Sequence, residues 1–347
     1  MLWRSKLDII SFLKLVAKFN LSDAEIEVLK HNVKSIGEQE YKLLEHQKIK
    51  LLLFRHCKKI NQVVELNKMK MFQYSNQLLV LQCLYKEYFE EIKKILCEFE
   101  SQNISYAILK GFSFSQDLYF YDGVSYRSFT DIDLLVDIKE CNRITNILTA
   151  NFFIQGKYVN DALIPVERSE IIYWTLNSHQ LPEFIKPSKY TRYSPRYRIE
   201  VDINTTIFEG GKEQSPISTK RILEHSENKK MFENFCYKAL TPTYSLLQLC
   251  YHFYKDTIYK SKVENKCDYL LIKFCDIREF ILFYKHQIDW DAFINITNSA
   301  NIGNQIYYPL WLVANFYGDL NINNILDKLH ITKTFEKKDL NWEGMLL

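Results

Sequence analysis

Two aspartates stand one residue apart at the start of an otherwise apolar segment, DIDLLV at residues 131–136. Successive side chains of a β-strand point to opposite faces, so Asp131 and Asp133 project from one face, roughly 6.5 to 7 Å apart along the backbone. The apolar residues that follow predict a strand buried in a core, with its acidic start at one rim. Two carboxylates held this close favour a bound cation.

A possible anion site precedes the acidic strand. Residues 106–109 form a short apolar run, Lys110 and Gly111 follow, and residues 112–119 carry apolar side chains at helical spacing. This pattern predicts a strand, a glycine turn and a helix. A glycine lets backbone amides approach a phosphate closely, and a helix N-terminus favours an anion. Arg127, four residues before Asp131, is close enough to reach the same region.

The combination resembles a known family. Lys110-Gly111, a helix that ends near Tyr119, then Arg127 and the DIDLLV strand are similar to the uncharacterised bacterial nucleotidyltransferase family of the polymerase-beta-like superfamily. That superfamily has a glycine beside a small hydroxyl residue or second glycine, an acid-apolar-acid strand, and a third acid on a later strand. Here one residue separates Gly111 from Ser113, a wider spacing than in many members. The resemblance implies an α+β fold, a mixed sheet flanked by helices, with helical N-terminal and C-terminal regions.

The third acid is expected in the segment YRIEVDI at residues 197–203, where apolar residues alternate with Glu200 and Asp202. This alternation predicts a half-buried strand. Asp202 resembles the third acid of the family, but Glu200 lies on the same face and is the alternative. The family commonly has a histidine two residues after this acid, and Asn204 occupies that position.

The resemblance implies a metal-dependent transfer of a nucleoside monophosphate from an NTP, with ATP expected, to a hydroxyl of an acceptor, with release of pyrophosphate. Two Mg²⁺ ions, or Mn²⁺, roughly 3.5 to 4 Å apart can stabilise the negative charge of such a reaction. Asp131 and Asp133 are expected to bind the metal that carries the triphosphate. These two acids and Asp202 are expected to share the metal that activates the acceptor.

The same resemblance gives roles to the phosphate-binding candidates. Gly111 and Ser113 are expected to hold the β- and γ-phosphates, and Lys110 and Arg127 to neutralise charge nearby; a structural ion pair is the alternative for Lys110.

Two histidines also match positions of the family. His179, followed by Leu181 and Pro182, resembles an element that precedes the third acid, and it is a possible substrate contact or a structural histidine. The family also has a histidine at the position of His252.

Composition restricts the partners. With 45 basic and 42 acidic residues, the formal charge of +3 gives no support to a nucleic-acid-coating surface. The acceptor is therefore expected to be a small molecule or a protein. Eight cysteines without paired or zinc-finger spacing predict reduced thiols and a cytoplasmic location. The N-terminal segment resembles neither a signal peptide nor a membrane span.

The chain is expected to divide into a helical N-terminal region (1–77), a catalytic domain (78–210) and a helical C-terminal domain (211–347), with the resemblance spanning about 78–318. A strongly periodic helix is predicted over 78–99, and its charges are interpreted as a solvated face. Residues 152–159 and 171–176 are predicted as strands, and 177–198, with three prolines, as a loop. A helix is expected from Pro242, and another after Asp289.

A protein that retains the fold but only binds a nucleotide or a partner is the alternative function. The asparagine at position 204 favours this alternative, whereas the presence of all three acids opposes it. A metal-dependent phosphohydrolase is disfavoured because no histidine-aspartate cluster with metal spacing is present.

Overall fold

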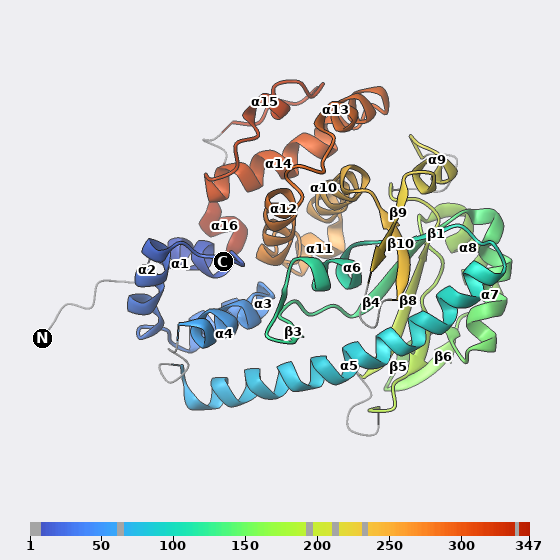
Figure 1. The fold of residues 1–347 in the computed structure, drawn as a ribbon, viewed down its shortest axis with the longest axis horizontal. Helices are drawn as coiled ribbons and strands as arrows, with labels where there is room; N and C mark the ends of the chain where they lie inside the picture. Colours follow the sequence, from blue (N-terminus) through green and yellow to red (C-terminus); the bar gives the residue numbers. More distant parts are fainter. Residues whose placement is uncertain (1–7, 61–65, 192–196, 210–214, 231–234, 337–339) are drawn as a thin grey trace, which may run out of the picture.

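A mixed eight-stranded sheet lies at one end of the molecule, and helices from both ends of the chain pack beside it (Figure 1). The computed structural model describes residues 8–60, 66–191, 197–209, 215–230, 235–336 and 340–347. The expected α+β class, a mixed sheet with flanking helices, is confirmed.

Parallel and antiparallel pairs alternate at the centre of the sheet, whereas the outer neighbours pair antiparallel. β4 pairs with β8 in parallel, and β1 pairs with β10 in parallel, while β1 and β4 are antiparallel. A separate two-stranded ribbon is formed by β2 and β3. From edge to edge the large sheet contains β6 (Ala162–Pro165), β5 (Ile154–Val159), β7 (Phe184–Pro187), β8 (Arg198–Asn204), β4 (Asp131–Val136), β1 (Tyr106–Ile108), β10 (Cys236–Leu240) and β9 (Ser226–Lys230), and the ribbon contains β2 (Phe120–Tyr121) and β3 (Val124–Ser125).

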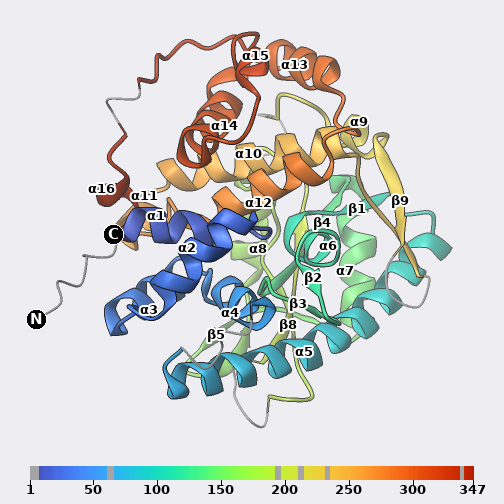
Figure 2. The same cartoon turned by 60° about the vertical axis from the view of Figure 1, so that its left-hand side comes forward.

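The N-terminal part is helical, as predicted. Ser22 caps α2 through a capping box with Glu25, in which each side chain bonds the backbone N–H of the other residue. α5 is longer than the predicted helix and runs along one side of the molecule from the N-terminal helices to the sheet (Figures 1 and 2). These helices are α1 (Ile9–Val16), α2 (Asp23–Val33), α3 (Glu38–His46), α4 (Lys50–Lys59) and α5 (Lys68–Ser101).

The C-terminal part is helical after β10. Pro242 occupies the first turn of α10, and the Asp289 side chain caps α13, as the sequence predicts. The helices are α10 (Pro242–Ile258), α11 (Lys260–Glu264), α12 (Leu271–Phe283), α13 (Trp290–Ser299), α14 (Gly303–Tyr317), α15 (Asn323–Leu326) and α16 (Trp342–Leu346). Shorter elements between the strands are α6 (Lys110–Asp117), η2 (Ile138–Glu140), α7 (Cys141–Ala150), α8 (Arg168–Asn177) and α9 (Thr219–Leu223).

The N-terminal and C-terminal helices share one hydrophobic core and direct polar contacts. Lys18 lies 2.9 Å from Asp319, and the Tyr317 hydroxyl donates to the carbonyl of Ala17 at 2.8 Å. The C-terminus also lies beside the N-terminal helices in both views (Figures 1 and 2). The two ends of the chain therefore pack as one body around the sheet.

Alternation along the central strands gives the sheet two different faces. Ile132, Leu134 and Val136 of β4 join the core beneath α5 and α7, whereas Leu135 faces the shared helical core. Because side chains alternate, Asp131 and Asp133 lie on the same face as Leu135. The acids therefore point toward the helical body rather than toward α5 and α7.

Two predictions about the fold are wrong in detail. Residues 171–176 lie in helix α8 rather than a strand; their β-branched and aromatic residues favour a strand, but β7 takes the place beside β5. The predicted loop contains β7, which pairs with both β5 and β8.

The predicted division into residues 1–77, 78–210 and 211–347 stays a prediction. The boundary after residue 77 falls inside α5, and the sheet continues beyond residue 210 because β10 pairs with β1. The C-terminal region is therefore not purely helical.

Across the described residues, no helix is both long enough and apolar enough to span a membrane. All eight cysteines are free thiols.

Candidate metal and nucleotide site

The three predicted acids converge. Each of Asp131, Asp133 and Asp202 offers a carboxylate oxygen, and these oxygens lie within 4.8 Å of one another. Parallel pairing of β4 with β8 places Asp133 directly beside Asp202, although the two residues are far apart in the sequence. The strand register therefore builds the cluster.

The structure distinguishes Asp202 from Glu200. Glu200 pairs in register with Asp131, but its carboxylate contacts the Arg198 guanidinium and lies outside the three-carboxylate cluster. Asp202 is the member of β8 that completes the cluster.

The carboxylates are poorly compensated. Burial raises the pKa of Asp202 well above its usual value, and Asp133 and Asp131 raise it further. Burial also raises the pKa of Asp133, against the opposing effect of Lys110. Within the described part of the chain, Asp133 Oδ2 and Asp202 Oδ1 are buried without a hydrogen-bond partner. Such oxygens fit a hard divalent cation, which would relieve the repulsion and supply the missing contacts.

Lys110 lies beside this cluster. Its Nζ is 3.3 Å from Asp133 Oδ1 and 3.3 Å from His252 Nε2. Burial alone would lower the pKa of Lys110, but the three aspartates raise it above its usual value, so the ammonium stays charged. Lys110 therefore carries the predicted positive charge and also forms the alternative ion pair, with Asp133.

Gly111 lies where the chain turns into α6, close to Arg127. A Cβ at this glycine would lie 3.4 Å from Phe129 Cβ, 3.6 Å from Arg127 Nη1 and 3.9 Å from the carbonyl of Asp131. Larger side chains would displace these neighbours.

Ser113 does not line the cavities that contain the acids. Its side chain is buried, and its hydroxyl lies 3.2 Å from the hydroxyl of Tyr237. The phosphate contact predicted for this hydroxyl therefore has no support from its position.

Arg127 lines the larger cavity together with Gly111 and Asp131, but most of its guanidinium is already engaged. Its Nε and Nη2 donate to Asp276 at 2.8 and 2.7 Å, in a two-point ion pair. The Tyr119 hydroxyl also donates to Asp276, at 2.7 Å. Only Nη1 points toward the glycine turn, so Arg127 combines a structural pair with a position at the site.

His179 lines the smaller cavity with all three acids. Burial, together with Lys255 and Lys110, lowers the pKa of His179 to about 3, so the imidazole is neutral. Its Nε2 accepts a hydrogen bond from Lys255 at 3.1 Å, which leaves the proton on Nδ1. Within the described chain, Nδ1 is buried and has no hydrogen-bond partner.

Several other side chains line the site, and the sequence did not predict them as site residues. His252 and Lys255 come from one face of α10, three residues apart, and Lys262 comes from α11. The Asn204 amide donates to Asp133 Oδ1 at 3.3 Å. The spacing of His252 and Lys255 indicated a shared face, but only the packing of α10 against the sheet places that face at the acids.

Two adjoining cavities surround the cluster. The smaller, of about 190 Å³, contains the three acids and His179, and the larger, of about 460 Å³, contains Asp131, Asp133 and Lys110. Lys48 and Lys50 of the N-terminal part line the larger cavity with Lys273 of α12. Segments from both ends of the chain therefore build the site.

Sequence similarity places the chain in a known protein family. A model of a family described as "Uncharacterised nucleotidyltransferase" matches residues 38–318, more than half of the chain. The chain belongs to this nucleotidyltransferase family. The match confirms the predicted resemblance and extends it from residue 78 to residue 38, so Lys48 and Lys50 lie within the matched region. No curated protein matches the sequence.

Proposed function

We propose that this chain moves a nucleoside monophosphate from an NTP to a hydroxyl of an acceptor and releases pyrophosphate. The observation that carries the proposal is the cluster of Asp131, Asp133 and Asp202, whose carboxylate oxygens lie within 4.8 Å of one another. Membership of the nucleotidyltransferase family supports the reaction class. We also propose that the mixed sheet is the polymerase-beta-like fold, because its two acidic strands are adjacent and parallel.

The three acids would hold Mg²⁺, as two ions, with Mn²⁺ as a substitute. Asp133 Oδ2 and Asp202 Oδ1, buried without hydrogen-bond partners among the described residues, are suitable ligand atoms. When bound, the metal supplies positive charge that stabilises phosphate oxygens and lowers the pKa of a hydroxyl.

The chemical step forms one bond and breaks one. The acceptor oxygen bonds to the α-phosphorus, the bond from that phosphorus to the bridging oxygen breaks, and pyrophosphate leaves with the electron pair. The Asp202 carboxylate would receive the proton of the acceptor hydroxyl through the oxygen that does not hold the metal, because Asp202 lies in the cluster.

The triphosphate would lie between the glycine turn and α10. Lys110 and Gly111 stand at one side of the acids, with Arg127 Nη1 directed at the turn. Lys255 and Lys262 line the same cavity from the other side. We propose ATP as the nucleotide, and His179 as a contact to nucleotide or acceptor.

The test follows a label from the α-phosphate of each of the four NTPs, with Mg²⁺ and separate small-molecule and protein fractions of the native lysate. We expect a labelled product with wild type, loss of product with Asp202→Asn, and retained product with Glu200→Gln. Equal losses in the two folded variants would contradict the assignment of the third acid.

A second candidate is a protein that binds the nucleotide without transfer. The amide of Asn204, at the position where the family commonly has a histidine, contacts Asp133 and favours this candidate. Wild-type protein that binds NTP with Mg²⁺, but labels nothing in either fraction, would replace the enzyme with this binding protein.

A further inference from the structure

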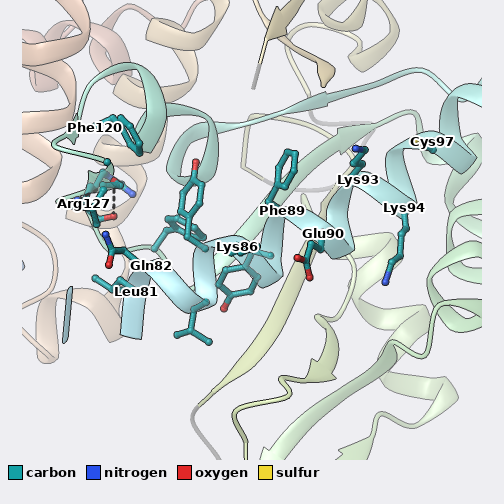
Figure 3. Close-up of a pocket in the computed structure, with 17 residues that line it drawn as sticks. Leu81, Gln82, Lys86, Phe89, Glu90, Lys93, Lys94, Cys97, Phe120 and Arg127 are labelled. Carbon is teal, nitrogen blue, oxygen red and sulfur yellow. Dashed lines mark hydrogen bonds between the residues drawn. The ribbon is translucent and has the colours of Figure 1, made fainter. Parts of the chain in front are cut away.

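A long groove lies outside the acidic site, between residues 81–97 of α5 and residues 120–129 around β2 and β3 (Figure 3). We call it the α5 groove. Its volume is about 800 Å³, within the range of about 300 to 1,000 Å³ that small-molecule sites occupy. From Leu81 to Cys97, α5 rises by about 24 Å at ~1.5 Å per residue, so the groove suits an elongated ligand.

The floor of the groove is apolar and aromatic. Tyr85 stacks on Phe112 with ring centroids 5.3 Å apart, and Phe129 meets Tyr85 edge-on at 5.4 Å. Leu84 and Tyr88 line the same surface. Side chains fixed against one another in this way form a preshaped apolar surface, which favours binding because little side-chain freedom is lost.

Charge at the rim is mostly positive. Lys86, Lys93 and Lys94 line the groove, whereas Glu90 is its acidic side chain and lies 4.0 Å from Lys189. Lys94 is paired with Glu91 at 2.7 Å, but neither Lys86 nor Lys93 has an acidic partner within 4 Å in the described part of the chain. Lys93 instead lies over the rings of Phe89 and Phe235, at 5.9 and 5.7 Å. An anion would supply the missing counter-charge.

Lys93 lies toward one end of the groove, and the charged side chain at the other end, Arg127, is already paired with Asp276 at 2.7 Å. Lys93, Lys94 and Cys97 gather at one end of Figure 3, while Leu81 and Arg127 lie at the other. A ligand with one anionic group at Lys93 and an apolar body directed toward Phe129 satisfies both ends.

We propose that the α5 groove is a second ligand site, distinct from the acidic cavity, which binds a small amphipathic anion with its charged group at Lys93 and its apolar body along α5. The inference is independent of the proposed nucleotidyl transfer. A long-chain carboxylate and an acyl phosphate share the required chemistry.

The test measures binding to the full-length protein by isothermal titration calorimetry below the micellar range. Dodecanoate, dodecyl phosphate, uncharged dodecan-1-ol and cationic dodecyltrimethylammonium distinguish the head groups. We expect the two anions to bind one-to-one, about tenfold more tightly than the alcohol, with the cation weakest. The preference should shrink at high ionic strength.

Variants locate the binding. Lys86→Glu/Lys93→Glu should weaken dodecanoate binding at least about tenfold, and Leu84→Asp should do the same by placing a charge on the floor. Matched controls on the same helix are Lys68→Glu and Leu79→Asp, whose positions lie outside the groove. Both should leave the affinity within about twofold. Because Leu84 is partly packed against the sheet core, the lysine double variant keeps the test valid if Leu84→Asp fails to fold.

Three results would overturn the proposal. The first is equal affinity for all head groups, and the second is equal weakening in variants and controls. The third is a concentration-dependent dimer, detected by sedimentation, that Lys86→Glu/Lys93→Glu dissociates, because the groove would then be a contact between two copies of the chain.

Discussion

The acidic cavity and the α5 groove differ in how they are built. The cavity combines β4, β8, α10 and the N-terminal lysines, and it buries carboxylate oxygens that lack hydrogen-bond partners among the described residues. The groove is formed mainly by one helix, and its aromatic rings pack against one another. Burial of carboxylates in the acidic cavity therefore favours a bound cation. The α5 groove instead presents an apolar surface with excess positive charge.

The two regions meet at a shared wall. Arg127 and Phe129 line both the groove and the larger cavity. The hydroxyl of Tyr88, on the groove side, lies 2.6 Å from the carbonyl of Arg198 and 3.2 Å from the carbonyl of Thr130, next to Asp131. We therefore expect the two regions to bind separate ligands, and we expect the shape of both regions to depend on this wall.

The largest expected effect separates the two regions. Asp131→Asn and Asp133→Asn keep the side-chain shape but remove a charge from the cluster. Transition-state stabilisation should therefore fall by several kcal/mol, and the rate of transfer should fall on the order of 100-fold or more. Binding of NTP should fall much less, because the glycine turn and its lysine remain. A pyrophosphate-release assay with the acceptor present, alongside calorimetry, measures both.

Dodecanoate affinity should be unchanged in these variants, and Leu79→Asp should keep full transfer. Loss of dodecanoate binding in a folded Asp133→Asn protein would show that the groove and the cavity form one site.

The shared wall should have the next largest effect. Asp276→Leu leaves the buried Arg127 guanidinium without its partner, so we expect a loss of about 3 kcal/mol in the free energy of unfolding. The double variant Arg127→Met/Asp276→Leu should recover part of this loss, because no unpaired charge remains. Urea denaturation measures the change.

Lys58→Met breaks a more exposed pair, with Asp122 at 3.0 Å, and serves as the control. Its loss should stay below about 1 kcal/mol. Equal losses of unfolding free energy in Asp276→Leu and Lys58→Met would show that the pair of Arg127 and Asp276 stabilises the wall no more than an exposed ion pair does.

A smaller effect is expected at the glycine turn. Gly111→Val should weaken NTP binding about tenfold in a protein that still folds, because its branched side chain would meet Phe129 and Arg127. Gly111→Ala is the matched control, since a Cβ alone makes ordinary contacts at 3.4 Å and beyond. Unchanged NTP affinity in folded Gly111→Val would remove the turn from the site.

The smallest effect concerns an exposed charge. Lys262 lines both cavities, and Lys262→Met should weaken NTP binding about threefold at low salt. The difference should disappear where the Debye length is roughly 3 Å. Lys260→Met, on the same helix but outside both cavities, should bind like wild type; a matching loss there would indicate only a general effect of net charge.

Local patterns were the most predictable part. The alternation in residues 131–136 and 197–203 correctly predicts two strands with their acids on one face, because side-chain direction in a strand repeats every two residues. The caps at Ser22 and Asp289 and the start at Pro242 are equally local. By contrast, the strand predicted over 171–176 is a helix, and β7 was missed, because the choice of neighbour in the sheet decides both.

The charges of α5 illustrate the same limit. The sequence pattern predicts that these charges form a solvated face, and Lys86 is exposed. Glu87, however, is buried and accepts from the Ser188 hydroxyl and the backbone N–H of Lys189. Lys93 lies over two aromatic rings, one of them from β10's neighbouring residue Phe235. Helical spacing identifies a face but not what packs beside it.

The sequence by itself determined the family, the strands that carry the acids and the glycine turn, since each rests on patterns of residues close together in the chain. Only the tertiary structure decided that Asp202 rather than Glu200 joins the cluster, that Ser113 turns toward Tyr237, and that Arg127 pairs with Asp276. These outcomes depend on strand register and on helices packed from distant segments. Such contacts are set by the burial of the whole core, and the local pattern does not encode them.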